Sequence, residues 1–261
     1  MLHKIKEYIP EPLKRLLKKM YNFFYNQRRV LEVARQRVLF VGMDKNKRFN
    51  CDFSDFNFQL NDNTPNTGFD AHYVYHPAWA ARVIAETRPN KHVDISSSLH
   101  FCSIVSAFMP VDFYDYRPVY LNLSNLTSMH ADLTRLPFAD NSIGSISCMH
   151  TIEHIGLGRY GDPLDPEGDI KAINELKRVV IADGNLLFVV PIGGIAKIEY
   201  NAHRVYTYSQ VLSYFLGFNL VSFALVTDDG KFIYNASKIE SDEQKYGCGC
   251  FYFKKSDELV G

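Results

Sequence analysis

With 261 residues, the chain can form one large domain, or one domain with an extension. Its apolar content of 46% supplies a substantial core, and its formal net charge is zero. That zero hides an asymmetry, because residues 1–40 carry ten Lys or Arg against three acidic residues, while the remainder is acidic. The acidic body excludes a nucleic-acid footprint, and the lack of any run of about 20 apolar residues excludes a membrane-spanning segment.

The basic N-terminal part also has a helical apolar pattern over residues 11–25. The apolar residues that recur at helical spacing are Leu13, Leu16, Leu17, Met20 and Phe24. Lysine and arginine occupy the opposite face. A helix lying on an anionic membrane has this pattern, and so does a helix docked on the domain with solvated lysines. The sequence predicts the helix and leaves both interpretations open.

The five cysteines are odd in number and scattered, which favours reduced thiols over a disulfide framework. No apolar segment with a cleavage site follows the basic start, so we expect no signal peptide. The expected location is the cytoplasm, peripheral to a membrane if the helix binds lipid. Cys248 and Cys250 lack the second cysteine pair that would complete a zinc site, and we predict no metal.

Beyond the helix, residues 44–70 are rich in Asn, Asp and Phe and predict an irregular segment. The elements expected next, in chain order, are helix 76–87, strand 92–96, helix 101–109, strands 111–115, 126–130 and 142–149, helix 165–181, strand 185–191, helix 208–216, and strands 220–227 and 250–254. This rhythm predicts a Rossmann-like doubly wound α/β sheet, mostly parallel, with an antiparallel last strand.

We therefore expect three parts. Residues 1–43 form a basic amphipathic helical extension, residues 44–70 a linker, and residues 71–255 the α/β domain.

The turn after the first expected strand is where such a sheet holds a nucleotide-type ligand. It reads DISSSLH over residues 94–100, which is Asp-x-Ser-x-Ser-x-His where Asp-x-Gly-x-Gly-x-Gly is expected. Serine is small and its hydroxyl can bond a ligand, but it lacks the freedom of glycine at positive φ. The same residues fit an ordinary strand-to-helix turn with a serine N-cap.

Carboxylates follow the next two expected strands. Asp115 lies 19 positions after Ser96, at the strand end where an acidic residue accepts both hydroxyls of a ribose. Asp112 is an alternative, although it falls within the strand. Asp132 follows the third strand and is placed to meet an adenine edge.

The fourth expected strand ends in His150-Thr-Ile-Glu153-His154, which spells the H-x-x-E-H pattern of inverted zincins. That motif needs a helix, whereas here an alternating strand precedes it and two loop glycines follow. We therefore interpret it as a strand-end loop near a substrate. His150 or His154 is the candidate base, with Glu153 orienting one of them.

The loop over residues 158–166 contains three candidate substrate contacts. Arg159 and Tyr160 offer an anion-binding and stacking pair, and Asp162 offers a carboxylate. Asp165 is expected to N-cap the following helix, with a proline at its first position. Further on, Arg204 and Tyr206 follow the fifth strand and are expected to close the same pocket.

The runs VDISSS, FYDYRP, ADLTRLPFADNSIGSISCMHTIEH and NELKRVVIADGNLLFVVPIG together resemble class I S-adenosylmethionine-dependent methyltransferases. More closely, HTIEHIGLGRYGDPLDPEGD and HRVYTYSQVL look like a domain-of-unknown-function family within that superfold, found in bacteria, often beside surface-polysaccharide genes, and in nematodes. The resemblance covers roughly residues 70–255. The cofactor contacts that it implies are Asp94, Ser96 and Ser98, with the ribose at Asp115 and the adenine at Asp132 and Leu133.

Two hypotheses follow. One is an S-adenosylmethionine-dependent methyltransferase that acts on a hydroxylated, glycan-related small molecule. The other is a non-catalytic binding module that keeps the fold while its glycine turn has changed.

Overall fold

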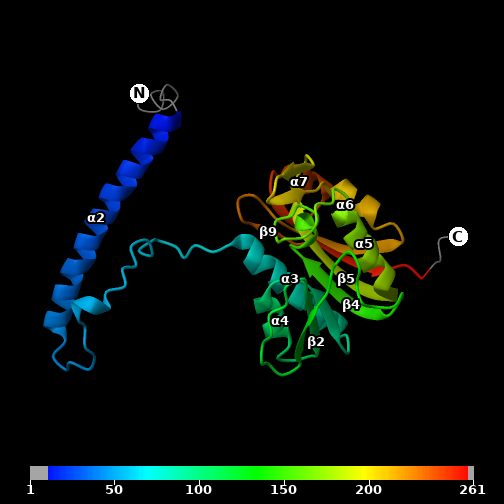
Figure 1. Cartoon of the computed structure of the whole chain (residues 1–261), viewed down its shortest axis with the longest axis horizontal. Helices are drawn as coiled ribbons and strands as arrows, with labels where there is room; N and C mark the ends of the chain where they lie inside the picture. Colours follow the sequence, from blue (N-terminus) through cyan, green and yellow to red (C-terminus); the bar gives the residue numbers. More distant parts are fainter. Residues whose placement is uncertain (1–10, 258–261) are drawn as a thin grey trace. The chain divides into compact units, whose positions relative to one another are not determined.

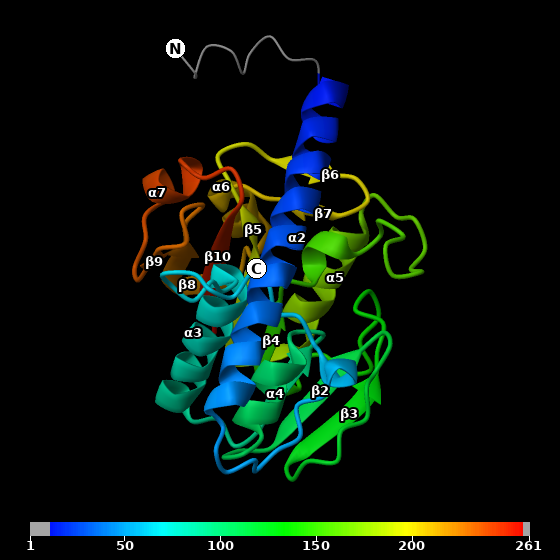
Figure 2. The same cartoon turned by 90° about the vertical axis from the view of Figure 1, so that its left-hand side faces the viewer.

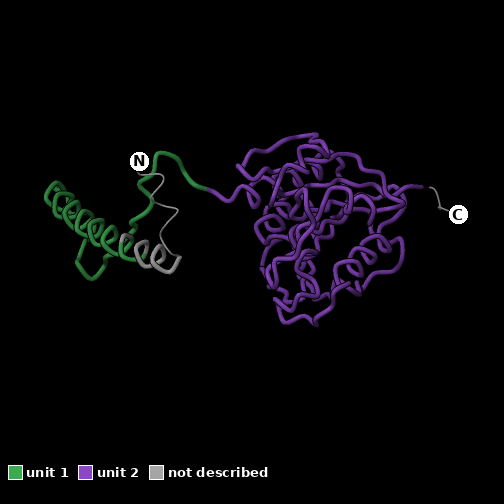
Figure 3. Tube along the Cα trace, turned by 90° about the horizontal axis from the view of Figure 1, so that it is seen from above, with its two compact units in different colours: residues 1–68 green, residues 69–261 purple. Residues whose placement is uncertain are grey.

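The computed structural model describes residues 11–257, and contacts within the chain divide it into two compact units, residues 1–68 and residues 69–261 (Figure 3). In the first unit, helix α2 (Glu11–Met43) continues past the apolar repeat of residues 11–25 to the end of the expected helical extension, whose first ten residues lie outside the described part of the chain. The short 3-10 helix η1 (Phe53–Asp55) follows. The segment after α2 contacts the helix: Arg29 Nε donates to the Leu60 carbonyl at 3.1 Å, and the Arg37 guanidinium lies 5.8 Å from the centre of the Phe56 ring.

The second unit contains an eight-stranded sheet in the order β3-β2-β1-β4-β5-β10-β8-β9 (Figure 1). Its strands are β1 (His92–Ile95), β2 (Val111–Asp115), β3 (Leu126–His130), β4 (Ile143–Met149), β5 (Val180–Ile192), β8 (Phe218–Val226), β9 (Phe232–Ile233) and β10 (Gly247–Lys255). The helices are α3 (Ala71–Thr87), α4 (Leu99–Val105), η2 (Ile152–His154), α5 (Gly168–Val179), α6 (Tyr208–Tyr214) and α7 (Lys238–Asp242). A separate ribbon pairs β6 (Lys197–Glu199) with β7 (His203–Val205).

Strands β1 to β5 pair in parallel, whereas β10 runs antiparallel to both β5 and β8. The doubly wound fold and the antiparallel last strand are therefore confirmed. β10 lies between β5 and β8, and the short β9 forms the edge of the sheet. Between β8 and β10 the chain forms β9 and α7, and the sequence pattern predicted neither of them.

Helices cover both faces of the sheet, as Figure 2 shows from the side of α3 and α4. Alternate residues of β5 enter two separate core clusters. Leu186, Phe188 and Val190 pack with α5 and α6, and Leu187 and Val189 pack with α3 and α4. A strand buried on both faces needs apolar residues at every position, which is why residues 186–190 form a continuous apolar run.

The start of α5 differs from the expectation at Asp165. The helix begins at Gly168, and its N-cap residue is Glu167, which makes no capping hydrogen bond through its side chain. The Asp165 carboxylate instead accepts from the Glu167 backbone N–H at 3.0 Å and pairs with Lys171 at 2.6 Å. The N-cap prediction was wrong because Asp165 closes a turn before the helix, with its carbonyl accepting from Gly168 N.

A buried chain of hydrogen bonds joins β1 to β4. His92 lies 2.8 Å from Ser145 Oγ through Nδ1 and 2.8 Å from Ser147 Oγ through Nε2. The Ser147 hydroxyl donates to Asp94, so it accepts from His92 Nε2–H, and His92 Nδ1 accepts from Ser145. Asp94 also accepts from Ser97 N at 3.0 Å. The chain therefore fixes the turn that follows β1.

Among residues 11–257, the structure has no helix that combines the length and the apolar character needed to cross a bilayer.

The burial of His92 predicts a loss of stability in acid. Burial lowers the pKa of His92 from 6.5 to about 3, so between these values the unfolded chain binds one proton more than the folded chain. The contribution of neutral His92 to the free energy of unfolding is complete above pH 6.5 and is lost as the pH falls towards 3. Urea unfolding at pH 7 to 4 should show wild type losing up to about 1.4 kcal/mol per pH unit more than His92→Gln. Ser145→Ala, which removes no titrating group, should keep the wild-type slope, and parallel slopes for wild type and His92→Gln would contradict the prediction.

Candidate functional site

A cavity of about 320 Å³ opens at the carboxyl ends of β1, β2, β3 and β4. Each strand contributes through the loop that follows it, and the loop between β4 and α5 completes the wall. The lining residues are Ser96, Asp115, Tyr116, Arg117, Ala131, Asp132, Leu133, Thr134, His150, Thr151, His154, Ile155, Gly156, Tyr160, Asp162, Pro163, Asp165 and Gly168. A ligand site is expected at this edge of an open α/β sheet.

Ser96 is the residue of the β1 turn that lines the cavity, and its φ of +56° is a conformation that favours glycine. Its backbone N–H donates to the Tyr114 carbonyl at 2.7 Å, which holds the residue in place. The turn thus keeps a glycine-like backbone although serine has replaced the glycine.

The other polar residues of this turn lie outside the cavity lining. Asp94 is fully buried and holds the turn from below. Ser97 Oγ accepts from Met149 N at 3.1 Å, and Ser98 Oγ accepts from Phe101 N at 3.3 Å as the N-cap of α4. These three side chains are therefore engaged within the fold.

Asp115, at the end of β2, and Asp132, after β3, both line the cavity but differ in their hydrogen bonds. One oxygen of Asp115 accepts from Arg117 N at 2.6 Å, and the other has no hydrogen bond within the described part of the chain. Asp132 accepts from the backbone and the hydroxyl of Thr134 at 2.8 and 2.7 Å through one oxygen. Leu133 is buried beside it and supplies an apolar wall. Asp112, by contrast, pairs with Lys91 away from the cavity.

After β4, two histidines flank one buried carboxyl group. His150 Nδ1 lies 2.8 Å from Glu153 Oε1, and His154 Nε2 lies 3.8 Å from the same oxygen. Burial raises the pKa of Glu153 to about 7 and lowers the pKa of His150 to about 4. Burial also lowers the pKa of His154, against the attraction of Glu153. Both imidazoles are therefore neutral near pH 7, and both line the cavity, whereas Glu153 lies behind them.

The tautomer of His154 follows from its contacts. Its Nδ1 lies 2.7 Å from the Ala202 carbonyl, to which it donates, because a carbonyl can only accept. The Arg159 guanidinium donates to the same carbonyl at 2.9 Å, and its longer approach to Nδ1, at 3.3 Å, is not a hydrogen bond in this tautomer. The lone pair of His154 is thus on Nε2, the atom that faces Glu153.

The loop after β4 is closed by Asp162 and Tyr160. Asp162 accepts from Gly156 N at 2.7 Å and from Tyr160 N at 3.2 Å, so it ties the loop together while lining the cavity. The Tyr160 ring lies under two guanidinium groups, those of Arg117 at 4.7 Å and Arg159 at 5.0 Å. Arg117, which follows β2, thereby joins two loops across the cavity.

Arg204 and Tyr206 support this loop from behind and do not line the cavity. Arg204 donates to the Ile155 carbonyl at 2.6 Å, and its Nε lies 3.6 Å from Asp169. The Tyr206 hydroxyl donates to Asp169 at 2.9 Å. Both side chains are buried, so the structure gives them a positioning role.

Sequence reasoning missed several residues of this region. Arg117 stands within the quoted run FYDYRP, but nothing in the spacing indicates that it reaches Tyr160. Thr151, which lines the cavity and donates to the Ser96 carbonyl at 2.9 Å, was also missed. His72 and Cys248 converge on the far side of His150, and their separation in sequence leaves no motif to detect.

The fold is Rossmann-like and similar to that of solved methyltransferases. The structure is similar to a protein of Galdieria sulphuraria provisionally named a sarcosine dimethylglycine methyltransferase (TM-score 0.52, 15% identity, covering 70% of this chain and 85% of that one). It is also similar to the 1,6-didemethyltoxoflavin-N1-methyltransferase of Burkholderia thailandensis, whose crystal holds S-adenosylhomocysteine (TM-score 0.51, 10% identity, covering 70% and 79%).

A family model described as "Caenorhabditis protein of unknown function, DUF268" matches residues 100–247. The chain belongs to this family. No curated protein matches this chain.

The strained turn yields a prediction about stability. Ser96→Gly should relieve a left-handed conformation that costs roughly 1–2 kcal/mol. The added glycine also gives the unfolded chain more conformational entropy, which offsets roughly 0.5–1 kcal/mol of this gain. We expect the free energy of unfolding in urea to rise by about 0.5–1 kcal/mol. Ser97→Gly is the matched control and should lower it by about 1–3 kcal/mol, because Met149 N then loses its buried acceptor. A Ser96→Gly variant less stable than wild type would show that φ at this position is not strained.

Proposed function

We propose that the chain is an S-adenosylmethionine-dependent methyltransferase that binds its cofactor in the cavity at the ends of β1 to β4. The observation that supports this most is the position of Asp115. Its carboxylate lines the cavity at the end of β2 and has one oxygen without a hydrogen bond in residues 11–257, as recognition of a ribose requires.

The other cavity walls fit the remaining parts of the same ligand. Asp132 and Leu133 provide a polar and an apolar surface for an adenine, and Ser96 lets the backbone approach the ligand where a glycine is usual. A volume of about 320 Å³ is within the usual range for a small-molecule site. Asp94 and Ser98, which the resemblance also implicates, would act by shaping the turn, because both are engaged within the fold.

S-adenosylmethionine, when bound, supplies an electrophilic methyl group on a sulfonium. The task of the chain is to position an acceptor and to remove its proton. His154 lines the cavity, and its neutral Nε2 carries a lone pair that can take this proton, with Glu153 Oε1 3.8 Å away. A proton taken from a substrate hydroxyl would reside on Nε2, where Glu153 stabilises the charge. His150 and Glu153 orient this part of the wall.

We propose a hydroxylated, glycan-related small molecule as the substrate. Tyr160 and Asp162 line the cavity and supply an aromatic ring and a carboxylate. Arg159 does not line it, but adds a cation beside Tyr160 at the same loop. Arg204 and Tyr206 hold that loop from behind. We also propose a cytoplasmic location, which the free thiols of all five cysteines support.

We further propose that α2 binds an anionic membrane surface. Within the first unit, Met20, Phe24, Leu31 and Val38 are all more than 45% exposed and recur along the helix at intervals of four or seven residues. Arginine and lysine residues accompany them over a segment that is strongly basic. An apolar line with basic neighbours is the pattern of an interfacial helix.

The cofactor proposal is tested by calorimetry. S-adenosylmethionine and S-adenosylhomocysteine should bind the full chain, and Asp115→Ala should weaken binding at least tenfold, because a charge-assisted hydrogen bond contributes about 1.5–3 kcal/mol. Asp112→Ala, a carboxylate of the same strand outside the cavity, should leave the affinity unchanged. An unchanged affinity in Asp115→Ala would refute the ribose assignment. No binding at millimolar ligand would refute methyl transfer and favour a binding module.

The membrane proposal is tested by co-sedimentation of the full chain with vesicles. Vesicles containing phosphatidylserine should bind it more than phosphatidylcholine vesicles, and added salt should weaken the difference. Phe24→Glu with Leu31→Glu should abolish binding, because both changes place charge on the apolar line. Ile104→Glu, an equally exposed change on α4, is the control and should bind normally. Equal binding to both vesicle types would contradict the proposal.

A further inference from the structure

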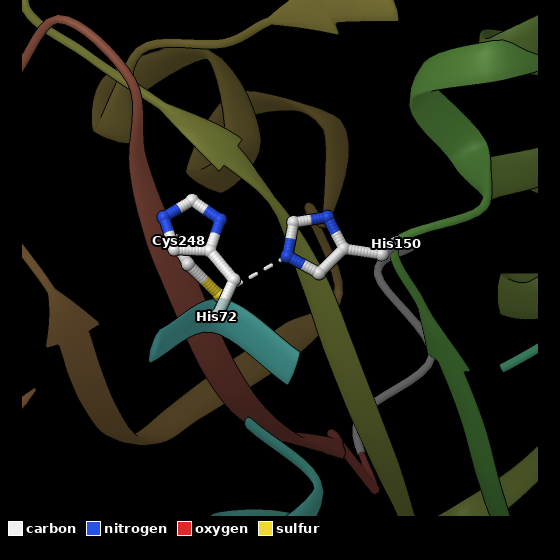
Figure 4. A group of neighbouring side chains, drawn as sticks. All are labelled: His72, His150 and Cys248. Carbon is white, nitrogen blue, oxygen red and sulfur yellow. Dashed lines mark hydrogen bonds between the residues drawn. The ribbon is translucent and has the colours of Figure 1, made fainter. Parts of the chain in front are cut away.

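Three side chains with metal-binding atoms converge behind His150. His72 comes from the first turn of α3, His150 from the end of β4 and Cys248 from β10, as Figure 4 shows. One ligand atom of each lies within 4.8 Å of the others. His150 and Cys248 are buried and His72 is partly buried, so the group is enclosed by the fold. Soft thiolate and imidazole ligands together favour zinc among the common divalent cations.

The hydrogen bonds around His150 orient it as a metal ligand. His150 Nδ1 lies 2.8 Å from Glu153 Oε1, and His150 Nε2 lies 3.3 Å from Cys248 Sγ. A carboxylate that holds the far nitrogen of a ligating histidine is the usual outer partner in zinc sites. In a tetrahedral zinc site the nitrogen and the sulfur would be about 3.5 Å apart, from Zn–N near 2.05 Å and Zn–S near 2.3 Å. The observed separation is close to this value.

His76 supplies an independent observation. It is fully buried, and its Nδ1 donates to the His72 carbonyl at 2.7 Å, which leaves the lone pair on Nε2. Nε2 has no hydrogen-bond partner in the described residues, and the ring lies 5.0 Å from that of His150. A buried acceptor without a partner calls for an ion or a water that satisfies it.

We propose that His72, His150 and Cys248 bind a zinc ion, with a water in the fourth position that donates a hydrogen bond to His76 Nε2. Binding converts the Cys248 thiol to a thiolate, and its proton goes to solvent. The site shares His150 with the cavity wall, but metal binding does not require methyl transfer. It would cross-link α3, β4 and β10, three elements that are distant in sequence.

The test uses the full chain carrying Cys51→Ser, which removes the exposed thiol. After treatment with a chelator, one Zn²⁺ or Co²⁺ per chain should bind. The Co²⁺ form should show the intense visible bands of tetrahedral cobalt and a sulfur-to-cobalt charge-transfer band in the near ultraviolet. Zn²⁺ at a hundredfold excess over its Kd should raise the midpoint of thermal unfolding by roughly 5 °C.

Matched variants locate the ligands. Cys248→Ser should lose the charge-transfer band, whereas Cys250→Ser should keep it, although its sulfur lies only 3.9 Å from that of Cys248. His72→Ala, in a partly buried position, should weaken Co²⁺ binding at least tenfold and remains informative if Cys248→Ser does not fold. Absence of Zn²⁺ and Co²⁺ binding, a band that survives Cys248→Ser, or uptake of copper but not zinc would each overturn the assignment.

Discussion

The hydrogen-bond chain from Ser145 through His92 and Ser147 to Asp94 is the constraint on which the cavity depends. It lies between neighbouring parallel strands and ends in a carboxylate that holds the backbone of Ser97. A buried polar chain of this kind is stable only when every member has its partner. Because all of its members do, the turn after β1 is held from beneath and keeps a left-handed residue without the glycine that usually occupies it.

Much of the fold is predictable from residue patterns. Strands 111–115 and 126–130 have the bounds that the structure gives to β2 and β3, because turn residues interrupt the apolar pattern on both sides. The apolar repeat over residues 11–25 predicts only the first half of α2, which continues to Met43. The elements β9 and α7 are too short for periodicity to reveal them.

The candidate site is predictable where a residue follows a strand directly. Asp115 and Asp132 reach the cavity because the carboxyl ends of parallel strands meet at one edge. Arg204 and Tyr206 were expected at the same cavity, but they come from the separate ribbon and its continuation, which pack behind the loop. The sequence does not show which side of a loop a side chain faces. The approach of Arg117 to Tyr160 depends on two loops folding towards each other, which no local pattern encodes.

His150 forms a partition between two environments. His150 lines the cavity, while its Nε2 faces Cys248 in the protein interior, beside His72. A ligand on either side that shifts this ring changes the free energy of binding on the other side. Thermodynamic reciprocity then requires that a ligand in the cavity and a metal ion beside Cys248 change each other's affinity by the same factor, whether they strengthen or weaken binding. A single imidazole at a strand end thus makes the two compartments energetically one system.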